Sequence, residues 1–258
     1  MKVVFSGSGT LYPVHVGALK ALEELVGPPE ALCGVSGGAI IAAARASGYE
    51  TADGSLEKLV LGALPGPAGL IDWSWAPWSC YGLIKGDRLL RKFRQIFPAT
   101  FGETGIPLTV ITSDLKTKTF RHYSTEKTPD ADLPLAVRKS LSIPFIFRHI
   151  DFEVDGGVMD NFPLDIYGRG LDVIGFRIVS TSDPSPVNTF VGYITAVIGA
   201  MMEASTREHI DDAVFARTVI LKVKGSSTDF NMSLKEATKL LRNGYKMASS
   251  QLGPYLLS

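Results

Sequence analysis

The sequence predicts a single α/β domain, and three features point to this fold class. The chain has 258 residues, of which 45% are hydrophobic, and this is enough to bury one large core. Short apolar runs typical of buried strands alternate with longer segments of helical periodicity. Glycine-rich junctions join a strand to a helix near residues 7–10 and 34–38. Repeats, low-complexity tracts and linkers are absent from the sequence, so we expect residues 1–258 to form one domain.

Charge and cysteine content narrow the function classes. Lys and Arg together number 26, as do Asp and Glu, which gives no overall electrostatic reason to expect nucleic acid as a partner. Two cysteines, Cys33 and Cys80, make no disulfide framework, and reduced thiols are the simplest interpretation. The N-terminus has no signal-peptide pattern, and the uncharged stretch 184–202 is more typical of a buried or interfacial helix than of a membrane span. We expect a cytoplasmic protein or one peripheral to a membrane.

The chain opens with a predicted strand followed by a helix. Residues 2–5 form a largely apolar run, which is typical of a buried strand. A helical pattern follows, in which Pro13 suits the first turn. The apolar face of this helix is predicted to carry Val16, Leu19, Leu22 and Val26.

The loop between these two elements suits an oxyanion hole. A dinucleotide site is the alternative, but Tyr12 stands at the third glycine position of Gly-x-Gly-x-x-Gly, and no acidic residue follows at the expected distance. Glycine permits backbone conformations in which neighbouring N–H groups point at one spot. We therefore expect the N–H groups of Gly7, Ser8 and Gly9 to bind an oxyanion.

The second strand-to-helix junction has the pattern of a nucleophile elbow. An apolar run over residues 31–33 leads into Gly-x-Ser-x-Gly, in which Gly34 and Gly38 allow a turn tight enough to expose the hydroxyl of Ser36. Ser36 also lies at the start of a helix, where unpaired N–H groups such as that of Gly37 favour an oxyanion. A glycine-rich turn without a catalytic role is the alternative.

The segment 65–86 differs from the rest of the chain. It holds all three tryptophans, Trp73, Trp75 and Trp78, together with prolines and glycines that argue against a regular element. Such a cluster is typical either of core packing or of an interface between apolar and aqueous phases. We expect either a plug in the core or a mobile lid whose tryptophans contact lipid.

A cationic helix is predicted after this segment. Residues 85–94 carry five cations and one acid, Asp87. We interpret them as the solvated face of a helix, with a phosphate-attracting patch as the alternative. Its buried side is predicted to be Leu89, Leu90 and Phe93.

Two strands and a helix are predicted over residues 107–114, 119–123 and 135–141. The first ends in polar residues, and strand ends line the site in open α/β sheets. Asp114 therefore either approaches the site or caps a turn. Arg138, in the helix, has the chemistry of an anchor for a loop.

A second candidate catalytic residue is Asp155. A strand pattern over residues 152–155 delivers this carboxylate at its end, and Gly156 and Gly157 allow a sharp turn close to whatever the carboxylate faces. A plain Asp-Gly turn is the alternative.

The remaining elements complete the predicted α/β pattern. Strands are expected over residues 173–179 and 218–223, and a long helix over 190–202. Ser233 is predicted to cap a C-terminal helix. The inward residues of that helix are predicted to be Leu234, Ala237, Leu240 and Leu241.

Taken in order, these stretches resemble the patatin-like phospholipase family over residues 3–245. Each motif is weak alone, whereas the ordered set is specific. The matching stretches are the loop 6–9, the helix residues His15, Gly17 and Leu19, and residues 34–38, 86–89, 112–115, 142–144, 155–157 and 161–163.

The resemblance implies a three-layer α/β/α fold with a central, mainly parallel sheet, and lipid acyl hydrolysis by a Ser-Asp dyad. It implies that Ser36 is the nucleophile and Asp155 its partner. In the main hypothesis, Asp155 accepts the hydroxyl proton while Ser36 attacks an ester carbonyl. We expect a lipid or ester substrate, a transient contact with a membrane or micelle surface, and no metal or cofactor.

The glycine-rich loop departs from the family pattern Gly-Gly-Gly-x-Arg/Lys-Gly. Ser8 replaces the middle glycine, Leu11 the basic residue and Tyr12 the last glycine. Backbone N–H donors survive these changes, but a cation near the oxyanion is lost. The hairpin before Asp155 is also shortened.

Three alternative functions stay open at this stage. In an α/β-hydrolase the acid is followed by a histidine, and here only His209 follows Asp155, in a charged helical run. Acyl transfer to an alcohol or thiol uses the same first half-reaction. A lipid-binding module that no longer catalyses is the third alternative.

Overall fold

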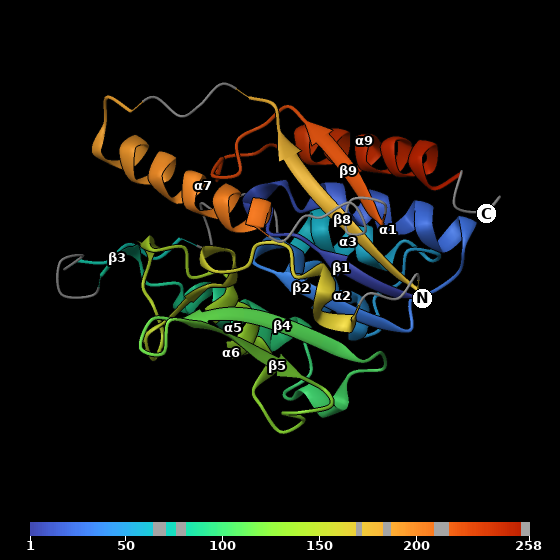
Figure 1. Ribbon diagram of the computed structural model, residues 1–258, viewed down its shortest axis with the longest axis horizontal. Helices are drawn as coiled ribbons and strands as arrows, with labels where there is room; N and C mark the ends of the chain where they lie inside the picture. The colour runs from blue at the N-terminus through green and yellow to red at the C-terminus, as the bar shows by residue number, and fades with distance from the viewer. Residues whose placement is uncertain (64–70, 76–80, 169–171, 183–186, 209–216, 254–258) are drawn as a thin grey trace.

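Residues 1–63, 71–75, 81–168, 172–182, 187–208 and 217–253 are described by the computed structural model of the chain (Figure 1). Their main sheet is built from β1 (Lys2–Phe5), β2 (Ala31–Val35), β4 (Leu108–Asp114), β5 (Thr119–Ser124), β7 (Glu153–Asp155), β8 (Val173–Ser180) and β9 (Thr218–Val223). The order is β5-β4-β2-β1-β8-β9, and β7 also pairs with β4. Each neighbouring pair in the series β4-β2-β1-β8-β9 is parallel. Strands β5 and β7 are antiparallel to β4.

Helices cover this sheet, as expected for the α/β class. They are α1 (Pro13–Leu25), α2 (Gly37–Ala46), α3 (Ser55–Lys58), α5 (Asp87–Ile96), α6 (Leu133–Ser140), α7 (Phe190–Glu208) and α9 (Leu234–Leu252). Short helical turns are η1 (Gly9–Leu11), η2 (Leu59–Ala63), η4 (Phe101–Glu103), η5 (Gly156–Val158) and η6 (Leu164–Tyr167). A separate two-stranded sheet pairs β3 (Gly82–Ile84) with β6 (Phe145–Phe147). The expected architecture, a mainly parallel sheet flanked by helices, is confirmed.

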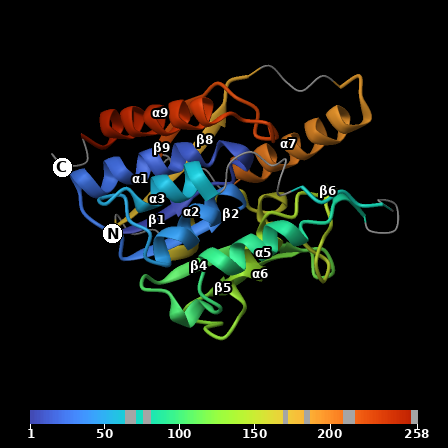
Figure 2. The same cartoon turned by 180° about the vertical axis from the view of Figure 1, so that it is seen from behind.

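The two faces of the sheet are covered unequally. Because successive strand residues point to opposite faces, Val3 and Phe5 of β1 join the larger core, while Val4 joins a smaller one. The larger core also contains apolar residues of α1, α2, α6 and α9, and α1, α2 and α9 stand in front of the sheet in Figure 2. In the smaller core, Phe162 and Leu164 cover β1 and β2.

Most predicted elements agree with the structure within a few residues. Ser233 caps α9 through a capping box with Glu236, as the sequence predicts. The inward position of Leu234 is wrong, since this side chain is 58% exposed. It lies six residues before the buried Leu240 and is therefore roughly a third of a turn away from that face of the helix.

The tryptophan segment is only partly described. Residues 64–70 and 76–80, with Trp78, lie outside the described residues. Trp73 is 65% exposed and Trp75 is 95% exposed, so these two do not plug the core. Trp73 pairs with Ile84 of β3 in an antiparallel bridge.

The cationic segment forms α5, and its buried side is smaller than predicted. Phe93 is buried, while Leu89 and Leu90 are half-buried. Among the described helices, none has the length and apolar character needed to cross a bilayer.

Arg138 of α6 is buried and anchors the segment that leads into α5. Its guanidinium donates to the carbonyl oxygens of Lys85 at 2.8 Å, Gly86 at 3.1 Å and Arg148 at 3.2 Å. It also donates to the hydroxyl of Ser142 at 2.7 Å. Burial lowers the pKa of Arg138 to about 10, so the group stays charged at neutral pH.

We expect Arg138→Lys to destabilise the fold by about 2–4 kcal/mol, because one ammonium cannot satisfy the same set of acceptors. Urea unfolding with an unchanged m value measures this difference. The matched control is Arg91→Lys on the exposed side of α5, which should change the unfolding free energy by less than about 0.5 kcal/mol. Similar small effects for both variants would contradict the anchor role.

Candidate active site

Strand β4 brings Ser36 and Asp155 together. Along one edge of β4, β2 pairs as far as Val35 opposite Ile111, and β7 continues with Asp155 opposite Thr112. Strand β5 occupies the other edge of β4 along the same stretch. The residue after β2 therefore meets the last residue of β7. Ser36 Oγ donates a hydrogen bond of 2.5 Å to Asp155 Oδ2.

The turn at Ser36 has the strained geometry of a nucleophile elbow. Ser36 has φ +52°, in a region that residues other than glycine rarely adopt. A Cβ on Gly34 would lie 2.5 Å from the Gly38 carbonyl oxygen, and one on Gly38 would lie 2.5 Å from the Ser6 carbonyl oxygen. Only glycine allows β2, α2 and the end of β1 to approach this closely.

Helix α6 and the residues after it hold the backbone of both Ser36 and Asp155. Ser140 Oγ accepts the N–H of Ser36 at 2.8 Å and donates to the carbonyl of Ile111 at 2.7 Å. The carbonyl of Ser142 accepts the N–H of Asp155 at 3.0 Å. Ser140 is buried and lies 104 residues from Ser36 in sequence. Sequence reasoning missed this positioning role, because no local pattern indicates a partner so distant.

The Asp155 carboxylate is buried beside two donors. Besides the Ser36 hydroxyl, Oδ1 accepts the N–H of Gly157 at 2.8 Å. Burial raises the pKa of Asp155 to about 6, although hydrogen bonds from Ser36 and Gly157 act in the opposite direction. The carboxylate is therefore a stronger base than an exposed aspartate and remains largely ionised at neutral pH.

The predicted oxyanion donors lie next to Ser36, but one is already engaged. Gly7, Ser8 and Gly9 line the same cleft as Ser36. The N–H of Gly7 donates to the carbonyl of Asn161 at 3.0 Å. Within the described residues, no hydrogen bond occupies the N–H of Ser8 or Gly9.

Gly37 supplies a further N–H group near Ser36. It is the first residue of α2, where an N–H has no acceptor within the helix. A Cβ on Gly37 would lie 2.5 Å from both the Gly9 carbonyl oxygen and the Ser8 hydroxyl. This close packing places Gly37 against the loop that carries Ser8 and Gly9.

A buried histidine supports the glycine-rich loop from behind. His15 Nε2 lies 3.0 Å from the carbonyl oxygen of Ser6, and its ring contacts Phe5 edge-on. Burial lowers the pKa of His15 to about 3, so the ring is neutral at physiological pH. The neutral ring can donate to Ser6, which fixes the chain just before the candidate oxyanion donors.

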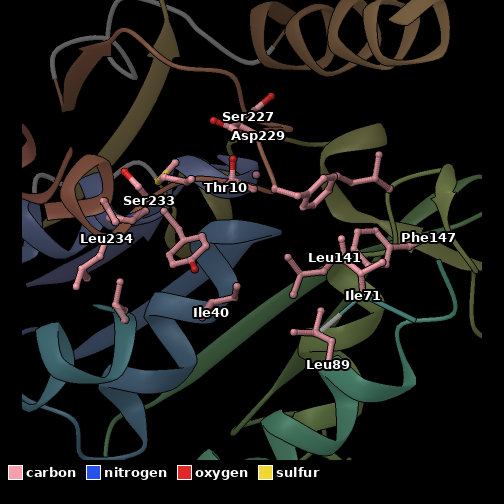
Figure 3. A pocket seen from close by; sticks show the side chains of 18 residues that line it. Thr10, Ile40, Ile71, Leu89, Leu141, Phe147, Ser227, Asp229, Ser233 and Leu234 are labelled. Atoms are coloured by element: carbon pink, nitrogen blue, oxygen red, sulfur yellow. The ribbon is translucent and has the colours of Figure 1, made fainter. Parts of the chain in front are cut away.

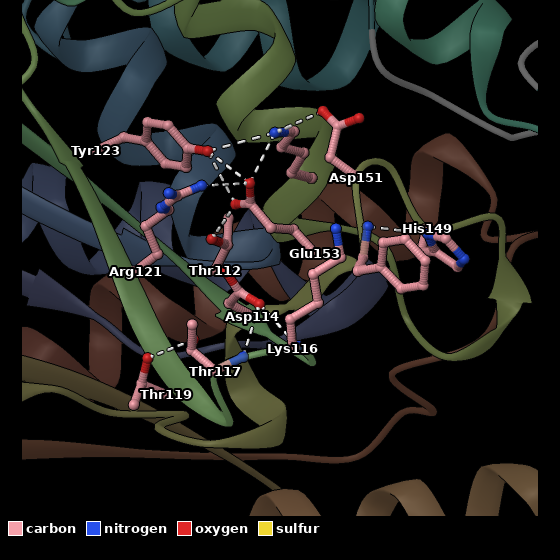
Figure 4. Close-up of polar contacts among 12 residues, drawn as sticks. Thr112, Asp114, Lys116, Thr117, Thr119, Arg121, Tyr123, His149, Asp151 and Glu153 are labelled. Atoms are coloured by element: carbon pink, nitrogen blue, oxygen red, sulfur yellow. Dashed lines mark hydrogen bonds and ion pairs between the residues drawn. The ribbon is translucent and has the colours of Figure 1, made fainter.

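A second buried carboxylate fixes strand β7 (Figure 4). Glu153 accepts hydrogen bonds from Thr112 at 2.6 Å, Tyr123 at 2.7 Å and Lys139 at 2.8 Å, and Arg121 pairs with it at 3.1 Å. Burial alone raises the pKa of Glu153, but these donors outweigh it and hold the pKa below its ordinary value. Glu153 is therefore ionised and ties β7 to β4, β5 and α6.

The cleft at Ser36 adjoins an apolar pocket (Figure 3). The cleft encloses about 1120 Å³, part of it open to solvent, and includes Ile146 of β6 and Met202 of α7. The pocket spans about 1000 Å³, part of it also open to solvent, and Figure 3 shows Leu141 and Phe147 beside it. Gly9, Ile143 and Ser227 line both spaces.

Asp114 is not part of this arrangement. Asp114 Oδ1 accepts the N–H groups of Lys116 and Thr117, so it caps the turn after β4. His209, the histidine of the α/β-hydrolase alternative, lies outside the described residues.

Comparisons with known proteins agree with this fold. The chain is 30% identical over 278 residues to the protein YqhO of Bacillus subtilis (strain 168), covering 93% of this chain and 94% of YqhO. It is 26% identical over 186 residues to the probable lipid hydrolase 463L of Invertebrate iridescent virus 6, covering 64% of this chain and 62% of that protein.

Among solved structures, VipD from Legionella pneumophila shares the fold, with a TM-score of 0.63 and 16% identity. The match covers 98% of this chain and 66% of the VipD chain. The family model for patatin-like phospholipase matches residues 3–167. The chain therefore belongs to the patatin-like phospholipase family, which indicates a lipid hydrolase.

Proposed function

We propose that the protein hydrolyses carboxylic esters of lipids through an acyl-enzyme on Ser36, with Asp155 as the base. The observation that carries this proposal is the 2.5 Å hydrogen bond from Ser36 Oγ to Asp155 Oδ2 beside a cleft. The strained turn at Ser36 and the raised pKa of Asp155 support it.

In the proposed reaction, Asp155 Oδ2 takes the hydroxyl proton while Ser36 Oγ attacks the ester carbonyl. The N–H groups of Ser8, Gly9 and Gly37 bind the oxyanion that forms. Collapse of this intermediate releases the alcohol, which receives the proton from Asp155. Asp155 then takes a proton from a water molecule, which attacks the acyl-enzyme. Collapse of this second intermediate breaks the bond to Ser36 Oγ, which receives the proton back from Asp155, and the free acid leaves.

The apolar pocket supports a substrate with an acyl chain. Gly9, Ile143 and Ser227 line both this pocket and the cleft, so a chain in the pocket has its carbonyl end near the candidate oxyanion donors. Apolar walls such as those of Ile40 and Phe147 favour hydrocarbon over a charged group.

The glycine-rich loop differs from the family pattern, but these differences do not favour the alternative of a lipid-binding module that no longer catalyses. Leu11, which stands at the basic position, is buried in the larger core. Ser8 keeps its N–H, and this residue lines the cleft. The Ser8 hydroxyl is buried and has no hydrogen-bond partner among the described residues. Acyl transfer shares the first half-reaction, and an added alcohol or thiol acceptor would divert the acyl group from water.

We expect Ser36→Ala and Asp155→Asn each to lower kcat/KM for a p-nitrophenyl ester by at least about 10³-fold, because each removes one half of the dyad. Both variants should remain folded by circular dichroism. Ser249→Ala removes a serine hydroxyl on α9 that does not line the cleft, and this variant should retain full activity. Turnover that survives in Ser36→Ala would exclude the serine mechanism.

We expect kcat/KM for the same soluble ester to fall as the pH drops through about 6. The raised pKa of Asp155 sets this limit, and protonation removes the base, so activity is high above this pH and lost below it. A pH profile of the folded wild type, with circular dichroism at each pH, measures the inflection. A profile that stays flat down to the ordinary aspartate value of 3.8 would contradict the role of Asp155.

We also propose that Trp73 and Trp75 contact the lipid phase, since both rings are exposed. Trp73→Ser combined with Trp75→Ser should lower the rate on phospholipid micelles by about tenfold, because less apolar surface enters the interface. The rate on the soluble ester should stay within about twofold, because the dyad is intact. Equal losses of rate on both substrates would instead indicate that these two residues stabilise the active site.

A further inference from the structure

Strained backbone conformations gather at one end of the molecule. Six non-glycine residues have positive φ in the described part of the chain, and Ser36 of the elbow is one of them. The other five are Tyr81, Lys118, Phe145, Asp151 and Phe152. Three of these are aromatic and exposed, Tyr81 by 67%, Phe145 by 60% and Phe152 by 48%. Such conformations are unfavourable for bulky side chains, and exposed rings gain no burial that offsets them.

Two of these rings, Tyr81 and Phe152, are held by contacts with His149. The rings of Tyr81 and His149 stack with centroids 5.9 Å apart, and those of His149 and Phe152 with centroids 5.1 Å apart. The ammonium of Lys116 lies 4.3 Å from the centre of the Phe152 ring. The stack thus connects the residue before β3, the turn before β7 and the turn between β4 and β5. We name Tyr81, Phe145, His149 and Phe152 the aromatic rim.

The aromatic rim adjoins the cleft of Ser36 through strand β6. Phe145 is exposed, the next residue Ile146 lines the cleft, and Phe147 lines the apolar pocket. Helix α7 also has an exposed apolar residue next to one that lines the cleft, since Met201 is exposed and Met202 lines the cleft. Exposed apolar surface therefore lies on two elements that form the walls of the cleft.

Two lysines lie on the surface beside the aromatic rim. Lys116 and Lys118 are exposed on the β4–β5 turn, and neither forms an ion pair with a described residue. The nearby acids are engaged, since Asp114 accepts backbone N–H groups and Asp151 pairs with Lys139 at 3.2 Å. Glu153 is buried among its donors. In Figure 1 this turn and β3 both lie at the left end of the molecule.

We propose that the aromatic rim and the two lysines dock the protein on an anionic lipid surface. Aromatic rings are favoured at the boundary between water and lipid tails, and lysines near it bind anionic head groups. A protein partner fits less well, because lysine is depleted in protein interfaces. The inference rests on the proposed function, since docking this end brings ester bonds to the cleft of Ser36.

Vesicle cosedimentation tests the docking surface separately from catalysis. The protein carries Ser36→Ala, and the vesicles are phosphatidylcholine alone or its equimolar mixture with phosphatidylglycerol. We expect Lys116→Glu with Lys118→Glu to weaken binding to the mixed vesicles by tenfold or more and to leave binding to phosphatidylcholine unchanged. Phe145→Asn with Phe152→Asn should weaken binding to both by about tenfold. Asparagine tolerates positive φ, so the melting temperature of this variant should equal or exceed that of its parent.

Matched controls lie at the other end of the strands, away from the β4–β5 turn. Leu25 and Val26 are exposed where α1 ends, and Lys127 is exposed beyond the end of β5. Leu25→Ser with Val26→Ser, and Lys127→Glu, should bind vesicles as their parent does. Unchanged binding in the aromatic variant, no binding of the parent to either vesicle, or a dimer in solution dispersed by the same substitutions would each overturn the proposal.

Hydrolysis of a soluble ester, measured with Ser36 restored, separates this proposal from the proposed function. Loss of vesicle binding at the control positions with normal ester hydrolysis overturns the docking surface alone. Vesicle binding that follows the expected pattern, in a protein with no ester hydrolysis, overturns the proposed function and retains the docking surface.

Discussion

The pairing of β2 and β7 along one edge of β4 is the constraint on which the rest of the site depends. Because β5 occupies the opposite edge, β7 has only the stretch beyond Ile111 left to pair with. This places the end of an antiparallel strand against the end of a parallel one. A carboxylate and a hydroxyl that are 119 residues apart in sequence therefore share one hydrogen bond.

Strand β7 carries two buried acids whose pKa values move in opposite directions. Glu153 has donors from four side chains and stays ionised, which stabilises the strand. Asp155 has one hydroxyl and one N–H, too few to offset burial, and its pKa rises. The number of hydrogen-bond donors around each carboxylate thus distinguishes a structural acid from a candidate catalytic acid, although both lie on one strand of three residues.

Local patterns in the sequence were sufficient for the fold class and for singling out the two side chains that share the Ser36–Asp155 hydrogen bond. The elbow at Ser36 and the turn after Asp155 are short motifs in which the local backbone geometry requires glycine. The hydroxyl of Ser140 and the carbonyl of Asn161 were not predictable, because their partners lie far away in the chain and no spacing encodes them. Leu234 was predicted to face inward because it is apolar. At the start of α9 its position faces solvent instead.

The short length of β7 has a consequence for how the protein responds to stress. Only three residues of β7 pair with β4, whereas the parallel strands are held within the main cores. Short elements with few backbone bonds open locally at a lower free energy than the whole domain. Detachment of β7 removes Asp155 from Ser36 without unfolding the sheet. Under the proposed mechanism, catalytic competence and folding of the main sheet are therefore separable, and a population with a folded sheet can contain inactive members.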